Sequence, residues 1–178
     1  AACGVAPGLK RRFLFENFSG FEQNIWQEEI EEAKARVNMH TKVQIAASDI
    51  STIVVGKAEQ NARRAGLVAL IDDGRLTFKQ CDARQVTPIA PAGLIVANPP
   101  YGEQSNPKSA TVASMMKDVA DNLKHNFSGW TARFLTSDRT LPRQMRLKES
   151  KKTPLFNGPL ECRLFEFNLV AGSLREKH

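Results

Sequence analysis

The stretch that decides the fold is GLIVANPPY, residues 93–101. Its first five residues are small or apolar and predict a buried strand of a parallel sheet, which the two following prolines end. Asn98 stands where the strand ends, before a turn whose prolines carry no backbone N–H donor. The stretch therefore predicts a rigid turn, rich in hydrogen-bond acceptors, at the carboxyl end of a strand.

Strand and helix patterns alternate on both sides of this stretch. Upstream lie a helix, a strand, a helix and a strand, predicted at residues 22–38, 43–47, 53–65 and 76–80. Downstream lie a helix and three strands, predicted at residues 111–127, 131–136, 153–156 and 161–169. Asn157-Gly158-Pro159 joins the last two, and Asn-Gly between strand-like runs predicts a hairpin. This order predicts an α/β fold with a mainly parallel sheet and a C-terminal antiparallel hairpin.

Two more predicted strands end at acidic residues, Asp49 and Asp82. Ligands of open α/β sheets lie beyond the carboxyl ends of the strands, so these residues and Asn98 indicate a shared site. The Asp49 carboxylate suits the two hydroxyls of a ribose, although Asp is also favoured as the N-cap of a helix that begins near Ile50. Asp82 suits an adenine amino group, with Cys81 beside the ring, although a plain strand-end turn would also explain it.

The turn after residue 97 predicts chemistry on a planar amino nitrogen. The side-chain oxygen of Asn98 and the carbonyl of Pro99 can accept both hydrogens of an exocyclic amine. Two acceptors favour a pyramidal nitrogen and aim its lone pair at a sulfonium methyl group, and this orientation supplies most of the catalysis. Tyr101 offers a face for stacking a base that has left its stack. The alternative is a strand-ending turn with a buried tyrosine.

The chain carries a net charge of +6 and has a pI near 9.4, which favours a polyanionic partner. Its basic residues are clustered, and an acidic block at residues 28–32 stands apart from them. We predict RNA contacts at Lys10, Arg11, Arg12, Arg139, Arg143 and Arg146, with Lys148, Lys151 and Lys152 extending the second cluster. The alternative is a solvated basic surface.

The length of 178 residues and the proportions of apolar and charged residues are those of one ordinary globular domain. No apolar run approaches the roughly 18 residues of a membrane span, and the N-terminus does not resemble a signal peptide, so we expect a cytoplasmic protein. The three cysteines and three histidines are scattered. We therefore expect reduced thiols, no disulfide framework and no metal site.

With these residues in view, the chain resembles class I methyltransferases that carry the (Asn/Asp)-Pro-Pro-(Tyr/Phe) motif. Among these it is most similar to the THUMP-associated RNA methylases of the RlmL type, the guanine-N2 methyltransferase module acting on 23S ribosomal RNA. The likeness covers nearly the whole chain. Its segments are VAPGL with RRF at 5–13, IW at 25–26, SD at 48–49, NARRAG at 61–66, ANPPYGE at 97–103 and FNGPLEC at 156–162.

The resemblance implies S-adenosyl-L-methionine as the cofactor and ribosomal RNA as the partner. Asp49 with Ile50 would then hold the cofactor ribose, and Asp82 with Ala83 its adenine. The residues that would hold and activate the target guanine are Asn98, Pro99, Pro100 and Tyr101, with Asn98 also beside the cofactor.

One part of the family pattern is absent. Its glycine-rich cofactor loop would precede Ala1, together with a first strand lying between the strands that end at Asp49 and Asn98. We therefore expect a single methyltransferase domain that is a fragment of a longer chain. Such a fragment would bind cofactor weakly or not at all, and it could dimerise.

Several other functions share parts of this pattern. The same motif serves adenine-N6 methylases of DNA and glutamine-N5 methylases of release factors. The missing cofactor loop leaves open a non-catalytic RNA-binding remnant. A nicotinamide oxidoreductase would explain Asp49, but the chain has no GxGxxG and that function leaves residues 98–101 without a role.

Overall fold

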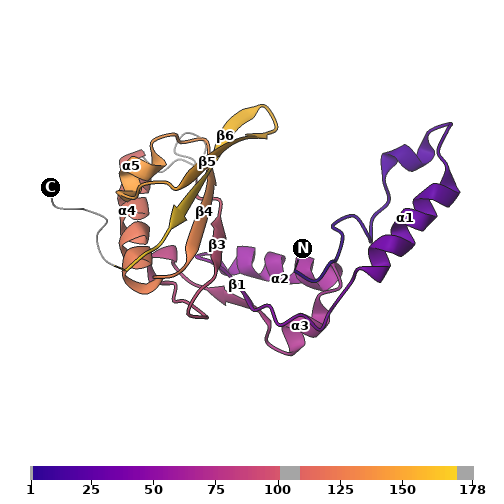
Figure 1. Cartoon of the computed structure of the whole chain (residues 1–178), viewed down its shortest axis with the longest axis horizontal. Helices are drawn as coiled ribbons and strands as arrows, with labels where there is room; N and C mark the ends of the chain where they lie inside the picture. Colours follow the sequence, from indigo (N-terminus) through magenta and orange to yellow (C-terminus); the bar gives the residue numbers. More distant parts are fainter. Residues whose placement is uncertain (1, 101–108, 172–178) are drawn as a thin grey trace. The chain divides into compact units, whose positions relative to one another are not determined.

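The computed structural model describes residues 2–100 and 109–171 and divides the chain into two compact units, Ala1–Gln80 and Cys81–His178. Figure 1 labels most of the helices and strands of both units. Each unit is described by itself below, and the single domain expected from the sequence stays a prediction. Within the described ranges, no helix is both long enough and apolar enough to cross a membrane.

The first unit pairs two parallel strands beneath a helix. Its elements are η1 (Leu14–Asn17), α1 (Gln23–Ala35), β1 (Ile45–Asp49), α2 (Thr52–Arg64), α3 (Val68–Asp72) and β2 (Leu76–Gln80). β1 and β2 lie in register from Ile45 opposite Leu76 to Asp49 opposite Gln80, and α2 contacts both strands. The carboxyl ends of the two strands therefore meet at one edge.

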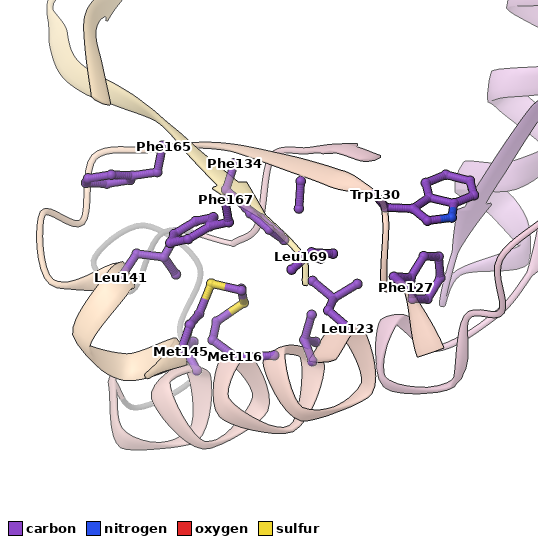
Figure 2. Close-up of a cluster of buried hydrophobic side chains, with 14 residues drawn as sticks. Met116, Leu123, Phe127, Trp130, Phe134, Leu141, Met145, Phe165, Phe167 and Leu169 are labelled. Atoms are coloured by element: carbon purple, nitrogen blue, oxygen red, sulfur yellow. The ribbon is translucent and has the colours of Figure 1, made fainter. Parts of the chain in front are cut away.

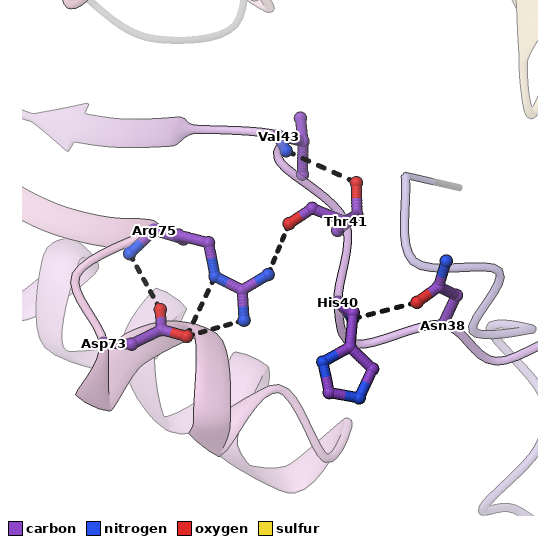
Figure 3. Close-up of polar contacts among 6 residues, drawn as sticks. All are labelled: Asn38, His40, Thr41, Val43, Asp73 and Arg75. Atoms are coloured by element: carbon purple, nitrogen blue, oxygen red, sulfur yellow. Dashed lines mark hydrogen bonds and ion pairs between the residues drawn. The ribbon is translucent and has the colours of Figure 1, made fainter.

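A clamp built on Arg75 holds the opposite, amino-terminal edge of this pair (Figure 3). The Arg75 guanidinium donates to the Asp73 carboxylate at 2.6 Å and to the backbone carbonyl of Thr41, in the segment that leads into β1. The hydrogen bonds from Arg75 lower the pKa of Asp73 below its usual range. This edge is thus fixed by side chains, and the carboxyl edge remains the place for a ligand.

The second unit contains a four-stranded mixed sheet. Its elements are η2 (Ala83–Gln85), β3 (Leu94–Ala97), α4 (Ser109–Asn126), β4 (Thr131–Thr136), α5 (Leu141–Met145), β5 (Lys151–Asn157) and β6 (Leu160–Asn168). The strand order is β3-β4-β6-β5. β3 and β4 are parallel, and β6 runs antiparallel to both β4 and β5.

The core of this unit lies between the sheet and helices α4 and α5 (Figure 2). Met116 and Leu123 of α4 are almost completely buried, as is Phe167 of β6. The rings of Trp130 and Phe127 pack in a T-shaped, edge-to-face pair, and the Trp130 indole N–H donates to the Ala90 carbonyl at 3.1 Å. This packing leaves room only for glycine at residue 93, where a Cβ would lie 2.5 Å from the Trp130 ring.

The predicted elements are all present, with two strands at the predicted residues and the others shifted by a few. The hairpin is confirmed, but its loop is Gly158-Pro159, and the positive φ of 60° falls on Gly158. That geometry suits a two-residue turn with glycine first, because Pro159 fixes a negative φ at the second position. The short helices α3 and α5 were not predicted, since five residues are too few to show a helical period.

One expectation about the deciding strand is wrong. β3 is a strand paired in parallel, but only one of its faces is covered: Ile95 and Ala97 pack against the core, and the residues that alternate with them do not. Leu94 and Val96 are 50% and 69% exposed. The strands also form two sheets rather than one, and within the described ranges β1 has β2 as its single strand neighbour. The family's first strand was expected between β1 and β3.

Candidate active site

The three residues after β3 lie at the surface of the second unit. Asn98 is exposed, Pro99 is half-buried and Pro100 is exposed. An amide buried in the protein interior could not reach a ligand, and the exposure of Asn98 excludes that arrangement. Tyr101, the fourth residue of the motif, lies outside the described residues.

Asp82 caps the short helix η2. Its carboxylate accepts from the Arg84 backbone N–H at 2.9 Å and from the Arg84 guanidinium at 2.6 Å. These hydrogen bonds lower the pKa of Asp82 from 3.8 to about 2. The strand-end turn suggested as an alternative is thus present, but a carboxylate offers about four lone-pair sites and can still accept from an adenine amine.

The segment that follows Asp82 is tied to α4. Asn122 of α4 donates from its side-chain amide to the Val86 carbonyl at 3.0 Å. Ala83, at the start of η2, is exposed. The second unit therefore fixes the backbone of this segment and leaves Ala83 accessible to a ligand.

Asp49 ends β1 and lies half-buried at the carboxyl edge of the first unit. It does not cap α2, because Ser51 is the N-cap and accepts from the Val54 N–H. Asp49 instead accepts from the Ser51 backbone N–H at 2.8 Å. The alternative explanation of Asp49 as an N-cap is therefore wrong.

A side chain from the neighbouring strand joins this edge. Gln80, at the end of β2, donates to the backbone carbonyl of Ile50 at 3.0 Å, and the Ile50 side chain is 66% exposed. The first unit thus brings Asp49, Ile50 and Gln80 together, and Gln80 was missed by sequence reasoning. The second unit carries Asp82, Ala83 and Asn98, and a site that joins the two groups stays a prediction.

The end of β4 carries a further polar network that the sequence reasoning missed. The Asp138 carboxylate accepts from the Thr140 N–H and from the Gln144 side-chain amide, both at 2.7 Å. Asp138 follows an apolar strand, as Asp49 and Asn98 do, so the same signal could have found it. The network fixes the first turn of α5.

The predicted RNA contacts lie on exposed residues of both units: Lys10, Arg11 and Arg12 in the first, and Arg139, Arg143 and Arg146 in the second. The Arg11 guanidinium lies 4.7 Å above the Phe13 ring, a cation–π geometry. Arg146 follows α5 in the left-handed region, with φ of 49°. Arg139 pairs with Glu161 at 2.7 Å. No group of three or more metal-ligating side chains occurs within residues 2–100 and 109–171.

Comparisons with known proteins agree on one family. Residues 2–166 match the family described as "UPF0020: RMKL-like, methyltransferase domain". Two curated relatives are both named ribosomal RNA large subunit methyltransferase K/L. The one from Shewanella baltica (strain OS185) is 38% identical over 178 residues and that from Shewanella amazonensis 37% over 181. Each alignment covers 98% of this chain, which spans 24% of the relative.

Solved structures agree with the fold. A possible methylase from Clostridium difficile 630 superposes with a TM-score of 0.80 at 26% identity, over 96% of this chain and 44% of that one. SMU.472, a candidate methyltransferase in complex with SAH, superposes with a TM-score of 0.79 at 24% identity, over 96% and 44%. A predicted N6-adenine-specific DNA methylase from Listeria monocytogenes superposes with a TM-score of 0.75 at 26% identity, over 94% and 41%.

Proposed function

Because this chain belongs to the family of RMKL-like methyltransferase domains, we propose that it is the catalytic part of an enzyme that methylates guanine N2 in 23S ribosomal RNA, with S-adenosyl-L-methionine as methyl donor. The observation that carries the proposal is the exposure of Asn98, which two prolines follow, directly after a strand paired in parallel. The names of the curated relatives support ribosomal RNA as the substrate class.

The residues at the strand ends fit the donor chemically. Asp49 has one carboxylate oxygen in a hydrogen bond with the Ser51 N–H, and its carboxylate can accept further bonds from ribose hydroxyls. Asp82 is held ionised by Arg84 and can accept from the adenine amine. When bound, the donor supplies an electrophilic methyl group on a sulfonium. The SAH complex of SMU.472 supports this choice of donor.

The chain's own contribution to the reaction is to orient the amine. The Asn98 side-chain oxygen and the Pro99 carbonyl accept its two hydrogens, and Pro100 offers no competing N–H. The nitrogen lone pair, otherwise delocalised into the guanine ring, then points along the line of attack. A nitrogen–carbon bond forms as the sulfur–carbon bond breaks, and the nitrogen loses one proton to water. Tyr101 is proposed to stack on the guanine.

The test is methyl transfer by the complete protein that contains this chain. Protein-free 23S ribosomal RNA, duplex DNA and a release factor are each incubated with isotope-labelled S-adenosyl-L-methionine, and the modified nucleosides or residues are identified by mass spectrometry. N2-methylguanosine from the ribosomal RNA is the expected product. If the label appears only on N6-methyladenine, the protein is an adenine methylase and the proposal is wrong. If it appears only on glutamine of the release factor, the protein is a glutamine methylase and the proposal is equally wrong.

A binding function without catalysis is separated by calorimetry. If the complete protein binds ribosomal RNA but releases no heat with S-adenosyl-L-methionine, the chain is a non-catalytic RNA-binding module. Heat from the complete protein together with methyl transfer supports the enzyme.

A further inference from the structure

The β5–β6 hairpin projects beyond the end of β4 in the second unit (Figure 1). The last pair between β4 and β6 is Thr136 with Arg163, whereas β6 continues to pair with β5 as far as Leu160 with Asn157. β4 is parallel to β3, so this free tip lies at the same carboxyl edge at which Asn98 follows β3. The hairpin tip and the segment that begins at Asn98 thus lie at the same edge of the sheet.

The hairpin tip exposes an aromatic side chain. Phe156 is 75% exposed and lies opposite Glu161 in the antiparallel register. The exposed ring is available to a ligand, and burying apolar surface contributes about 25 cal/mol per Å² to binding. Among the described residues of the second unit, Phe156 is not part of the buried core, which other side chains form.

The charges beside Phe156 favour a polyanion. Glu161 is held between Arg139 and Arg163, each at 2.7 Å, and this pairing lowers the pKa of Glu161. Alternation along β5 places Lys152 on the same face as Phe156, and Lys152 is exposed. Two arginines thus flank the carboxylate opposite Phe156, and Lys152 adds a third cation roughly 13 Å further along the same face of the hairpin. Aromatic faces bordered by basic side chains are the usual platform for unpaired bases of single-stranded RNA.

We infer that Phe156 stacks on an unpaired base of the RNA substrate, at a nucleotide other than the one that is methylated. β5 lies three strands from β3, and strands are spaced by about 4.8 Å, so the ring lies roughly 14 Å across the sheet from the acceptor turn. One base cannot span that distance. Phe156 therefore reads a neighbouring stretch of the same strand and contributes to substrate selection, an inference that rests on the proposed RNA methyltransferase function.

The experiment measures steady-state methylation of 23S ribosomal RNA by the complete protein, as wild type and as Phe156→Ala. Loss of one stacking contact is expected to raise KM for RNA about ten-fold. kcat should stay within about two-fold, because the contact is made equally in the ground state and the transition state. Phe156→Trp should restore the wild-type KM, whereas Phe156→Leu, which keeps an apolar side chain without a π face, should not.

The matched control is Phe18→Ala, which removes a side chain of similar exposure, 70%, from the first unit and should leave KM unchanged. Sedimentation of the same variants identifies a protein partner. If Phe156→Ala changes the oligomeric state and not KM, the ring docks against a second copy and the inference is wrong. A KM unaffected in Phe156→Ala, or rescued equally by leucine, also overturns it. A wild type that does not methylate RNA refutes the proposed function instead, so the two failures are distinguishable.

Discussion

The Arg84 guanidinium and the Asp82 carboxylate form a local pair two residues apart, with Nη2 to Oδ2 at 2.6 Å and Nε to Oδ1 at 3.0 Å. The Arg84 backbone N–H adds a third kind of donor to the same carboxylate. This arrangement keeps Asp82 ionised as an acceptor at any pH that a cell experiences, and it orients the start of η2.

Arg84→Ala is expected to return the pKa of Asp82 from about 2 toward 3.8. The folded-state pKa is the depressed one, so the pair stabilises the fold above about pH 4, and that contribution is lost as the pH falls toward 2. Wild type and variant should therefore differ in stability at neutral pH and converge in acid. Carboxyl-carbon NMR titration measures the pKa directly. Arg63→Ala, which removes an exposed pair with Glu59, is the control and should leave the Asp82 titration unmoved.

Asn98→Ala is expected to lower kcat for methyl transfer by a factor of about 100 or more, because removing one preorganised hydrogen-bonding group that acts on the reacting centre typically costs that much. Binding of S-adenosyl-L-methionine by calorimetry should change little. The exposure of Asn98 makes a folding defect an unsuitable explanation. If the variant turns over at the wild-type rate, Asn98 has no catalytic role.

Gly93→Ala is expected to destabilise the second unit by about 1–3 kcal/mol, the usual cost of overpacking. The added methyl group would lie 2.5 Å from the Trp130 ring, which its hydrogen bond to Ala90 holds in place. Gly56→Ala is the matched control, since Gly56 lies within α2 with no atom within 4 Å of its Cβ position, and alanine should stabilise that helix by about 0.5–1 kcal/mol. Urea denaturation reports both changes. Equal effects at the two positions would contradict the packing argument.

The double variant Arg143→Gln/Arg146→Asn tests the basic cluster around α5. Asparagine is chosen because it tolerates the positive φ of Arg146 better than most residues. If both arginines contact phosphates, the magnitude of the slope of log affinity against log salt should fall by about 1 for each. Filter binding over a salt series measures this slope.

The control is the double variant Lys34→Gln/Arg36→Gln, which removes two cations paired with Glu31 and Glu32 on and just after α1. If the two double variants change the slope equally, the net charge of the protein accounts for the effect and the arginines make no specific phosphate contact.

Most of the fold could be predicted because its signals are local. β2 and β4 fall at the predicted residues, since apolar and polar side chains alternate along each, at Leu76 and Phe78 in β2 and at Ala132 and Phe134 in β4. The end of α2 was predicted to within one residue because Gly66 takes a positive φ of 86° directly after its C-cap. Asn98 was found for the same reason, as a polar residue after an apolar strand.

What could not be predicted depends on contacts between distant residues. Leu94 and Val96 are exposed because they alternate with Ile95 and Ala97, which take the face against the core, and an apolar run does not show which of its faces stays uncovered. The link from Gln80 to the Ile50 carbonyl joins residues thirty positions apart. The pairing of Arg139 with Glu161 likewise required the hairpin to fold back beside α5.

The outward side of β3 has a consequence for the behaviour of the chain in solution. Within residues 2–100 and 109–171, no strand pairs with the outer side of β3, so its backbone amides and carbonyls are available to a further strand, and its exposed leucine and valine add apolar surface there. Where that side stays open, two molecules can pair their β3 strands, so raising the protein concentration should favour precipitation. A lysine in place of Val96 would discourage that growth, because an ammonium group at the margin of a sheet repels an incoming neighbour.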